Sequence, residues 1–393
     1  MEFPSSSYLL GDYSLSYFDY VSNDECTGFG WNFLNSTDDK IHSFLNPQLR
    51  RINLLYLQPL VAVVGALANL AFIFIVCKVP YMRNRMNVIL LNLSIADLIY
   101  LMVGAGEKFV TILRSPVWGD SLVLGQICQC FIIIPLLNTV VFTSLLLVSM
   151  VSLERYVAVC RPLQHLKIAS LRRTVAYVIS VWVFCIALSV FLIPSSMDFS
   201  TVCVRWPDTP LYTGFPVKVG FCQARSDLWS SVNESLQTIP FFVALMLNVV
   251  CTVKIVSKLY GRSGFPSAPD GHRQHRQTVR KYTSSANAAT KMLLINGIAY
   301  FLLVTPFHVT KIIQFIISVS PNSSCNCLEF KEMSGLLLYL NSAVNPFIYG
   351  VTNRTYRQAY YNIFCHGKFK TREGQNACIT TVWNLTHIRR PAI

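Results

Sequence analysis

The chain has 393 residues, of which 53% are hydrophobic and only 13% charged, and its formal net charge is +14. An ordinary soluble domain carries about a quarter charged residues, so this composition excludes a protein whose whole surface faces water. Much of the surface must instead face lipid.

Seven stretches with at most one charged residue each are long enough to cross a bilayer, whose hydrocarbon core of about 30 Å takes roughly 20 helical residues. They comprise residues 52–77, 86–106, 121–153, 174–197, 235–253, 292–310 and 333–353. The hydrophobic runs are continuous, whereas alternation is typical of barrel strands. The sequence therefore predicts an all-α bundle of seven membrane-spanning helices at 52–351.

The distribution of charge orients this bundle. With the N-terminal tail, residues 1–51, outside the cell, the inner connections hold 23 of the 33 Lys and Arg, in agreement with the positive-inside rule. Fifteen of the 19 acids lie outside, so the outer face favours a cationic partner, and the inner face suits anionic lipids. The net charge is thus a property of the inner face and does not indicate nucleic-acid binding.

The tail and the outer loops carry candidate modification sites. The tail begins without a basic and apolar leader, so we expect no cleaved signal peptide. Tyr13, Tyr17 and Tyr20 lie among acids, which is typical of a disordered leader or of a sulfated segment that captures a basic ligand. Sequons on the outer side predict glycosylation at Asn35, Asn233 and Asn322.

An acid in a membrane span is costly and usually faces the bundle interior. Asp97 in "LNLSIADLIY" is such a residue. Its expected neighbours are polar side chains on other spans, namely Asn69, Ser144, Asn341, Ser342 and Asn345. A carboxylate with several neutral oxygens suits a hard cation such as Na⁺; the alternative is a neutral Asp that hydrogen-bonds the helices together.

Two motifs lie at the inner ends of spans three and seven. Glu154 and Arg155 in "SLERYVAV" follow 33 uncharged residues. Their pairing is either a routine contact at a helix end or a latch that releases the arginine to a partner. "NPFIY" at 345–349 combines a proline with a tyrosine one turn later, which indicates a bistable inner end.

Pro306 lies inside the sixth uncharged run, in "LLVTPFH". Membrane helices tolerate a proline when neighbours satisfy the freed carbonyl, so it marks either a fixed packing kink or a moving hinge. After the seventh span, aromatics in "NRTYRQAYYNIFC" predict an amphipathic interfacial eighth helix at 352–366. Cys365 is a predicted palmitoylation site, and residues 367–393 form a cytoplasmic tail.

Together these motifs resemble those of rhodopsin-like (class A) G-protein-coupled receptors over nearly all of residues 52–366. The matching features are Asn69, "LSIADL", "ERY", Trp182, Pro306 and "NPFIY". The resemblance implies a multi-pass receptor of the plasma membrane in which an extracellular ligand moves spans six and seven. Arg155 is then released to a heterotrimeric G protein, and arrestin and receptor kinases are further expected partners.

The resemblance also assigns roles to single positions. The polar residues around Asp97 match the family's sodium pocket. The residues assigned to activation are Glu154, Arg155, Tyr156, Tyr300, Val304, Pro306, Asn345, Pro346 and Tyr349. The family's outer disulfide carries over to Cys130 and Cys222, with Cys203 as a competing partner for Cys130. A Cys128–Cys203 bridge is a second candidate.

Two positions narrow the ligand class. Tyr339 stands where retinal-binding relatives need a lysine, and Leu137 stands where amine-binding relatives use an aspartate. "ERYVAVCRPLQH" and the long, cysteine-bearing connection at 198–234 resemble the neuropeptide and peptide-hormone branch, and the acidic outer face indicates a basic peptide. The predicted ligand-binding residues are Glu107, Leu137, Asn138, His308, Gln314 and Tyr339. Glu107 has Lys108 and Arg114 as alternative partners.

Other functions compete with this interpretation. A lipid or another small non-amine ligand would fit the same family. A transporter or channel would place Asp97 on an ion path, but the sequence shows neither the repeats nor the polar stripe expected of one. No nucleophile–base pair or metal-ligand spacing indicates an enzyme, and no cofactor is expected besides Na⁺ as an allosteric ion.

The chain departs from the family pattern at several positions. In span five, Asn248 stands two turns after Pro240 where a tyrosine is usual, and an alternative register puts Thr252 there. Val304 replaces the bulky Trp of span six, with Tyr300 one turn lower. Ala286 stands near where an acid often pairs with the span-three arginine, so we expect that lock to be absent.

Overall fold

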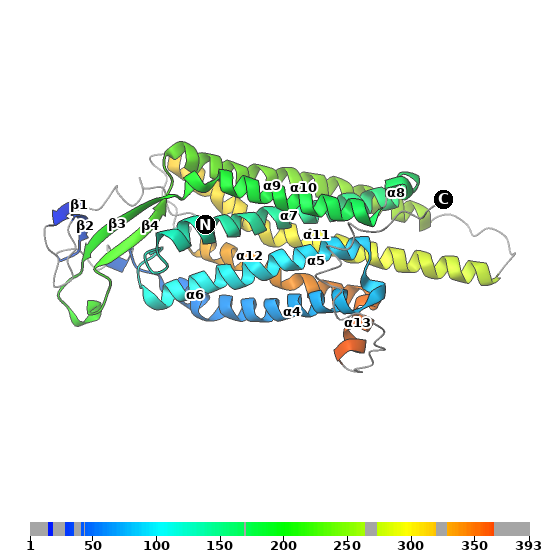
Figure 1. The fold of residues 1–393 in the computed structure, drawn as a ribbon, viewed down its shortest axis with the longest axis horizontal. Coiled ribbons are helices and arrows are strands. Elements are labelled where there is room, and N and C mark those ends of the chain that lie inside the picture. Colours follow the sequence, from blue (N-terminus) through cyan, green and yellow to red (C-terminus); the bar gives the residue numbers. More distant parts are fainter. Residues whose placement is uncertain are drawn as a thin grey trace, which may run out of the picture.

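The computed structural model describes residues 15–18, 28–34, 41–42, 44–168, 170–263, 273–319 and 328–364, and its long helices run side by side (Figure 1). Span one is continuous through α3 (Gln48–Ile52), η1 (Asn53–Leu57) and α4 (Gln58–Lys78). Span two comprises α5 (Arg85–Ile99), η3 (Tyr100–Gly104) and α6 (Ala105–Arg114), and span three comprises η4 (Ile127–Ile133) and α7 (Ile134–Cys160). Spans four to seven are α9 (Leu171–Phe191), α10 (Asp227–Ser263), α11 (Arg273–Val319) and α12 (Leu328–Thr352).

The predicted bundle of seven membrane helices is confirmed. Six of the described helices are long and apolar enough to cross a membrane. The seventh, α12, packs against α11 and α4 and carries Lys331 and Glu332 near its start. Large apolar side chains such as Val183 and Phe184 on α9 point outward, which suits a helix in contact with lipid.

Short segments connect the spans: η2 (Pro80–Met82), α8 (Pro162–Ile168), η5 (Ile193–Ser195) and η6 (Pro210–Tyr212). After span seven the chain forms α13 (Arg354–Phe364), at the place of the predicted amphipathic helix. The helices α10 and α11 extend beyond the predicted spans, and α11 projects past the other helices (Figure 1). Uncharged runs mark where a helix meets lipid, and they do not mark where the helix ends.

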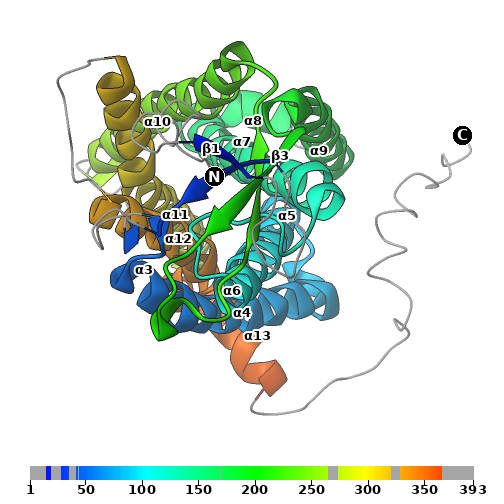
Figure 2. The ribbon, with the colours of Figure 1, turned by 90° about the vertical axis from the view of Figure 1, so that its left-hand side faces the viewer.

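A four-stranded sheet lies across one end of the bundle (Figures 1 and 2). It contains β1 (Leu15–Phe18), β2 (Gly28–Asn32), β3 (Asp198–Arg205) and β4 (Lys218–Gln223) in that order. β3 and β4 form an antiparallel hairpin, and β2 pairs with β3 in parallel. The all-α expectation omitted this sheet. We call this end of the bundle the sheet end and the opposite end, where α13 lies, the α13 end.

An aromatic cluster gives the sheet its own small core. Trp31 meets Phe44 edge-on at 4.5 Å, and Phe33 stacks on Trp206 at 5.5 Å. Part of the N-terminal tail is therefore folded onto the outer loops, including Tyr17 in β1. Tyr13 and Tyr20 lie outside the described residues, so the disordered-leader and sulfation alternatives stay open there.

Covalent and polar contacts join the sheet and its aromatic cluster, together called the cap, to the helices. Cys130 of η4 is disulfide-bonded to Cys222 of β4, with the two Cα atoms 5.7 Å apart. Asp120, in the connection between spans two and three, accepts a hydrogen bond from the Gly220 backbone N–H at 3.0 Å. Arg50 of α3 forms an ion pair with Glu332 of α12. The disulfide and the Asp120 contact thus join the cap to span three and to the connection between spans two and three, and the ion pair joins spans one and seven at the same end.

Candidate functional site

A cavity of about 320 Å³ opens into the bundle below the sheet. The lining comes from spans one, two, three, five, six and seven and from β4. All six residues predicted to bind ligand lie on it: Glu107, Leu137, Asn138, His308, Gln314 and Tyr339. The structure thus brings residues from α6, α7, α11 and α12 into one site.

Three π-helical segments shape the sheet end of the first three spans. Each puts a polar side chain on the cavity wall: Asn53 from η1, Tyr100 from η3 and Gln129 from η4. π-Helical turns inside α-helices are frequent at functional sites, because the extra residue turns a side chain away from the regular helical face. Sequence reasoning did not find these three residues.

The α6 wall of the cavity holds a charged pair. Glu107 is 6% exposed, and its Oε2 lies 3.1 Å from Nζ of Lys108. Gln129 donates a hydrogen bond to Glu107 Oε1 at 3.1 Å. In this conformation Glu107 is therefore paired with Lys108. Lys108 is one of the two residues that the sequence gave as alternative partners to a ligand.

The wall formed by α10 and α11 contains a buried lysine. Lys311 is only 7% exposed and donates to Oε1 of Gln237 at 2.5 Å. One turn before it, His308 stacks on Phe241 with 4.0 Å between the ring centres. The predicted span ended at residue 310, so Lys311 was not considered. The continuation of α11 to Val319 makes it a residue of the helix interior.

The polar residues predicted around Asp97 come together at the floor of the cavity. Asp97 Oδ2 accepts a hydrogen bond from Asn345 at 2.6 Å, and Asn69 donates to the Ser342 carbonyl at 2.9 Å. Ser144, Asn341 and Ser342 line the same cavity as Asp97. Within the described residues, the buried Oδ1 of Asn341 has no hydrogen-bond partner. A carboxylate and unpaired neutral oxygens in one place fit a small hard cation.

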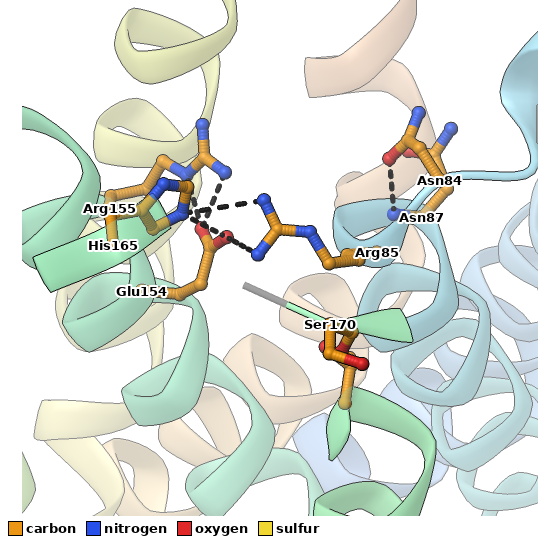
Figure 3. A network of polar contacts seen from close by, with 8 residues as sticks. Asn84, Arg85, Asn87, Glu154, Arg155, His165 and Ser170 are labelled. Carbon is orange, nitrogen blue, oxygen red and sulfur yellow. Dashed lines mark hydrogen bonds and ion pairs between the residues drawn. The ribbon is translucent and has the colours of Figure 1, made fainter. Parts of the chain in front are cut away.

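At the α13 end, charged groups converge on Glu154 (Figure 3). Its Oε2 accepts from Nη2 and Nε of Arg155 at 2.5 and 2.9 Å. Its Oε1 lies 3.2 Å from Nε2 of His165 on α8 and 3.8 Å from Nη1 of Arg85 on α5. Arg155 of "ERY" is therefore bound to Glu154. Side chains from three elements, α5, α7 and α8, contact this one carboxylate. Neither Arg85 nor His165 was predicted as a functional residue.

The inner end of span seven is fixed by aromatic packing. Tyr349 of "NPFIY" is fully buried and lies 5.1 Å from the ring of Phe72. Tyr356 of α13 stacks on the same Phe72 and donates its hydroxyl hydrogen to Asn87 of α5. Burial raises the pKa of Tyr356, so its hydroxyl keeps this hydrogen at neutral pH. The helix α13 is thereby joined to spans one, two and seven.

A family model described as "7 transmembrane receptor (rhodopsin family)" matches residues 68–349. The chain belongs to this family. It is accordingly a multi-pass membrane receptor and not an enzyme.

Receptors of the neuropeptide and peptide-hormone branch are among its relatives. Neuromedin-U receptor 2 of Mus musculus is 26% identical over 345 residues, covering 85% of this chain and 82% of the relative. Somatostatin receptor type 5 of Rattus norvegicus is 25% identical, covering 80% and 77%. Growth hormone secretagogue receptor type 1 of Mus musculus is 25% identical, covering 79% and 80%.

The departures of this receptor from the family pattern have structural counterparts. Asn248 of α10 bonds to Ser152 and lies 3.5 Å from Ser149, so an amide joins spans three and five where a tyrosine is usual. Val304 and Tyr300 both belong to the large buried cluster and line the cavity, and α11 is helical through Pro306. Ala286 lies in a part of α11 whose side chains are not described.

The cysteine pairing is settled in favour of Cys130–Cys222. The Cys128–Cys203 bridge is wrong, because Cys128 is a free thiol and Cys203 belongs to another disulfide. Spacing in the sequence could not distinguish among cysteines that all lie in outer segments.

One of the predicted glycosylation sites needs correction. Asn233 lies in the first turns of α10, is 8% exposed and accepts from Gln237 at 3.0 Å. A glycan has no room on that buried amide, because α10 begins earlier than its apolar run and turns this sequon toward the cavity. Asn35, Asn322 and the palmitoylation site Cys365 lie outside the described residues.

Proposed function

We propose that this receptor lies in the plasma membrane with its sheet end outside the cell, binds an extracellular peptide in the cavity, and activates heterotrimeric G proteins. The observation that carries the proposal is the single cavity that connects the sheet end with Asp97. A ligand there contacts spans two, three, six and seven at once. The excess of Lys and Arg in the connections at the α13 end supports the orientation.

The cap favours a peptide over a lipid. The sheet, with its disulfide-linked hairpin, lies over one end of the bundle (Figure 2), and β4 lines the cavity. An extended ligand can therefore contact both the backbone and the side chains of the hairpin. The relatives, which include receptors for neuromedin-U and somatostatin, support the same class. The acidic outer face attracts a basic peptide, and Glu107 can exchange Lys108 for a cationic group of the ligand.

The buried packing below the cavity argues against the transporter or channel alternative. A large buried apolar cluster includes Leu90, Leu147 and Tyr349 from spans two, three and seven. A conduction path would need polar residues through this region. The same cluster suits a receptor, because a tightly packed core transmits a shift of one helix to its neighbours.

Activation follows as a shift between two conformations. A peptide that contacts α11 and α12 better in the active conformation moves these helices relative to α7, with Pro306 and Pro346 as the sites of bending. Tyr300 and Val304, which line the cavity, and Asn345, which donates to Asp97, transmit this motion. Arg155 then leaves Glu154 and, with Tyr156, receives the G protein. Arrestin and receptor kinases would recognise the same active conformation.

The cluster around Asp97 would hold Na⁺ as an allosteric ion. Its ligands would be oxygens of Asp97, Ser144, Asn341, Ser342 and Asn345. A bound cation at this place favours the conformation in which spans two and seven stay close. We expect rising Na⁺ concentration to weaken agonist binding to the purified receptor and Asp97→Asn to abolish that dependence; an unchanged dependence in the variant would exclude the site.

A reporter screen in cells tests the receptor function. Cells that express the chain are exposed to a neuropeptide library, and calcium and cyclic-AMP reporters are read against cells expressing Arg155→Ala. We expect a response to one or a few peptides that is lost in the variant at equal surface expression. A response only to amines or lipids would refute the peptide ligand, and solute uptake without any reporter signal would favour a transporter.

A further inference from the structure

His165 closes the motif "ERYVAVCRPLQH" and lies on the short helix α8. Its ring points at the inner end of α7, where Glu154 and Arg155 lie (Figure 3). The Nε2 atom of His165 is 3.2 Å from Oε1 of Glu154 and 3.5 Å from Nη2 of Arg85. One ring nitrogen therefore meets both a carboxylate and a guanidinium.

These two contacts need different forms of the imidazole. A guanidinium has hydrogen-bond donors and no acceptor, so Arg85 can bond only to an Nε2 that lacks a hydrogen. An ionised Glu154 accepts only from an Nε2 that carries one. A neutral ring can take either form, whereas a protonated ring has a hydrogen on both nitrogens. Protonation thus assigns His165 to Glu154 and adds a positive charge beside Arg85.

Glu154 uses its two oxygens for different partners. Oε2 accepts from Arg155 and Oε1 faces His165, so the two do not compete for one oxygen. When Arg155 leaves, Glu154 loses its closest partner, although its side chain is only 18% exposed. A carboxylate that is partly withdrawn from water is destabilised when its partner is removed. A protonated His165 lessens this penalty, because it already lies beside the other oxygen.

The other charged groups near His165 are less suited to this role. Arg85 is 29% exposed and lies 3.8 Å from Oε1 of Glu154, farther than the imidazole does. The remaining cations near α8 are engaged elsewhere or lie at the surface: Arg161 contacts Gln164, Arg173 donates to the Lys167 carbonyl, and Lys167 itself is exposed. Of the groups that contact Glu154 in the described part of the chain, the imidazole is the one whose charge changes near neutral pH.

We propose that His165 is a positioning residue that takes over Glu154 when Arg155 is released, and that protonation of its ring favours this release. The proposal rests on the proposed coupling to G proteins. The proton comes from water at the α13 end, which the 17% exposed side chain can reach, and binds the ring nitrogen that lacks a hydrogen. In the resting conformation the protonated ring adds a second cation near Arg155, which weakens its hold, and in the active conformation it neutralises Glu154. A fall in pH at this face therefore promotes coupling.

Nucleotide exchange at controlled pH tests the role of His165. Membranes of cells that express the chain are assayed for basal binding of a labelled, non-hydrolysable GTP analogue, relative to Arg155→Ala membranes at the same pH. We expect the native signal to rise about threefold from about pH 8 to about pH 6, the range in which an imidazole changes its charge, a modest factor because partly exposed ion pairs are weak.

Variants at matched surface expression locate the titrating group. We expect His165→Gln and Glu154→Gln to remove the rise, and His165→Lys to give a high signal at every pH because its charge is permanent. Lys167→Gln is the matched control, since it removes a cation from the exposed face of the same helix. The rise should persist in that variant.

A second measurement needs no G protein. The purified full chain in lipid nanodiscs is labelled in its histidine rings, and the resonance of His165 is identified by its absence in His165→Gln. Because linkage is reciprocal, a release that protonation favours must itself favour protonation. We expect the pH midpoint of this resonance to be higher in Arg155→Ala by about half a unit, which is the same threefold factor.

Several outcomes would overturn the proposal. A flat native signal would do so, as would a rise that survives His165→Gln, which would assign the titration to another group. Equal midpoints in the native chain and Arg155→Ala would show that His165 and Arg155 are not coupled through Glu154. The two proposals fail separately. Absence of basal and peptide-stimulated nucleotide binding at every pH would refute the G-protein coupling, and the midpoints would then decide the role of His165. A peptide-stimulated signal with no pH dependence would refute that role alone.

Discussion

The two ends of the bundle use charged side chains in different ways. Toward the sheet end, Glu107 and Asp97 of span two and Lys311 of span six lie apart from one another around a cavity, and each has a neighbour of its own. At the α13 end, Arg155, Arg85 and His165 gather around the single carboxylate of Glu154 (Figure 3). Dispersed charges leave room for another molecule, whereas converging charges hold the helices that carry them.

The two ends also differ in how their parts are joined. The sheet end assembles segments far apart in the sequence, and a disulfide across 92 residues fastens them. At the α13 end, where Cys77 of α4 is also disulfide-bonded, the helices that carry Arg155, Arg85 and His165 meet through side-chain contacts with Glu154 that can break and re-form, which suits the end at which a receptor must move. If this comparison is right, changes at the sheet end should affect stability and ligand response, and changes at the α13 end should affect basal signalling.

The largest effect is expected from removal of the Cys130–Cys222 disulfide. The double variant Cys130→Ser/Cys222→Ser loses a cross-link across 92 residues, which stabilises by up to about 4 to 5 kcal/mol in the chain-entropy model. We expect a clearly lower thermal unfolding midpoint and a weakened peptide response, with basal signalling per receptor at the surface unchanged. Cys160→Ser is the control, because Cys160 is a free cysteine. An unchanged midpoint would mean that polar contacts alone hold the cap.

A smaller effect is expected from Glu154→Gln at the other end. The variant removes the carboxylate that holds Arg155, Arg85 and His165. A partly buried ion pair of this kind is worth about 1 kcal/mol, which corresponds to a roughly fivefold shift between two conformations. We therefore expect basal reporter signal, normalised to surface expression, to rise about fivefold, and Glu154→Asp to restore much of the restraint. Basal signal at the native level would show that Glu154 does not restrain Arg155.

The sequence predicted the part of the fold that the membrane dictates. Lipid requires continuous apolar helices of a set length, so the seven spans and the polar residues facing inward could be placed from hydropathy alone. The sheet could not, because β2 pairs with β3 across about 170 residues and neither strand has a strong local pattern. Pairing of segments so distant depends on the folded bundle that brings them together.

The candidate site shows the same division. Asp97 and Asn345 were expected to meet, because an acid inside a span needs a polar partner, and they lie 2.6 Å apart. Lys311 and Arg85 were missed, since each lies just outside an uncharged run and was counted with the connections. The helices extend past those runs, so the residues nearest the membrane boundary are the ones that sequence reasoning is least able to place.

The smallest effect is expected from Arg85, which tests whether the α13 end acts as a unit. Arg85 reaches Glu154 from α5 at 3.8 Å and is 29% exposed, so its ion pair is worth about 0.5 kcal/mol. We expect Arg85→Gln to raise basal signal about twofold. Arg83→Gln is the matched control, because Arg83 donates to the Cys77 carbonyl on its own segment. Equal effects of the two variants would show that net charge at this face matters and that Arg85 does not bind Glu154. A selective effect of Arg85→Gln that vanishes in the Glu154→Gln background would show that Arg85 acts on Arg155 through their shared carboxylate.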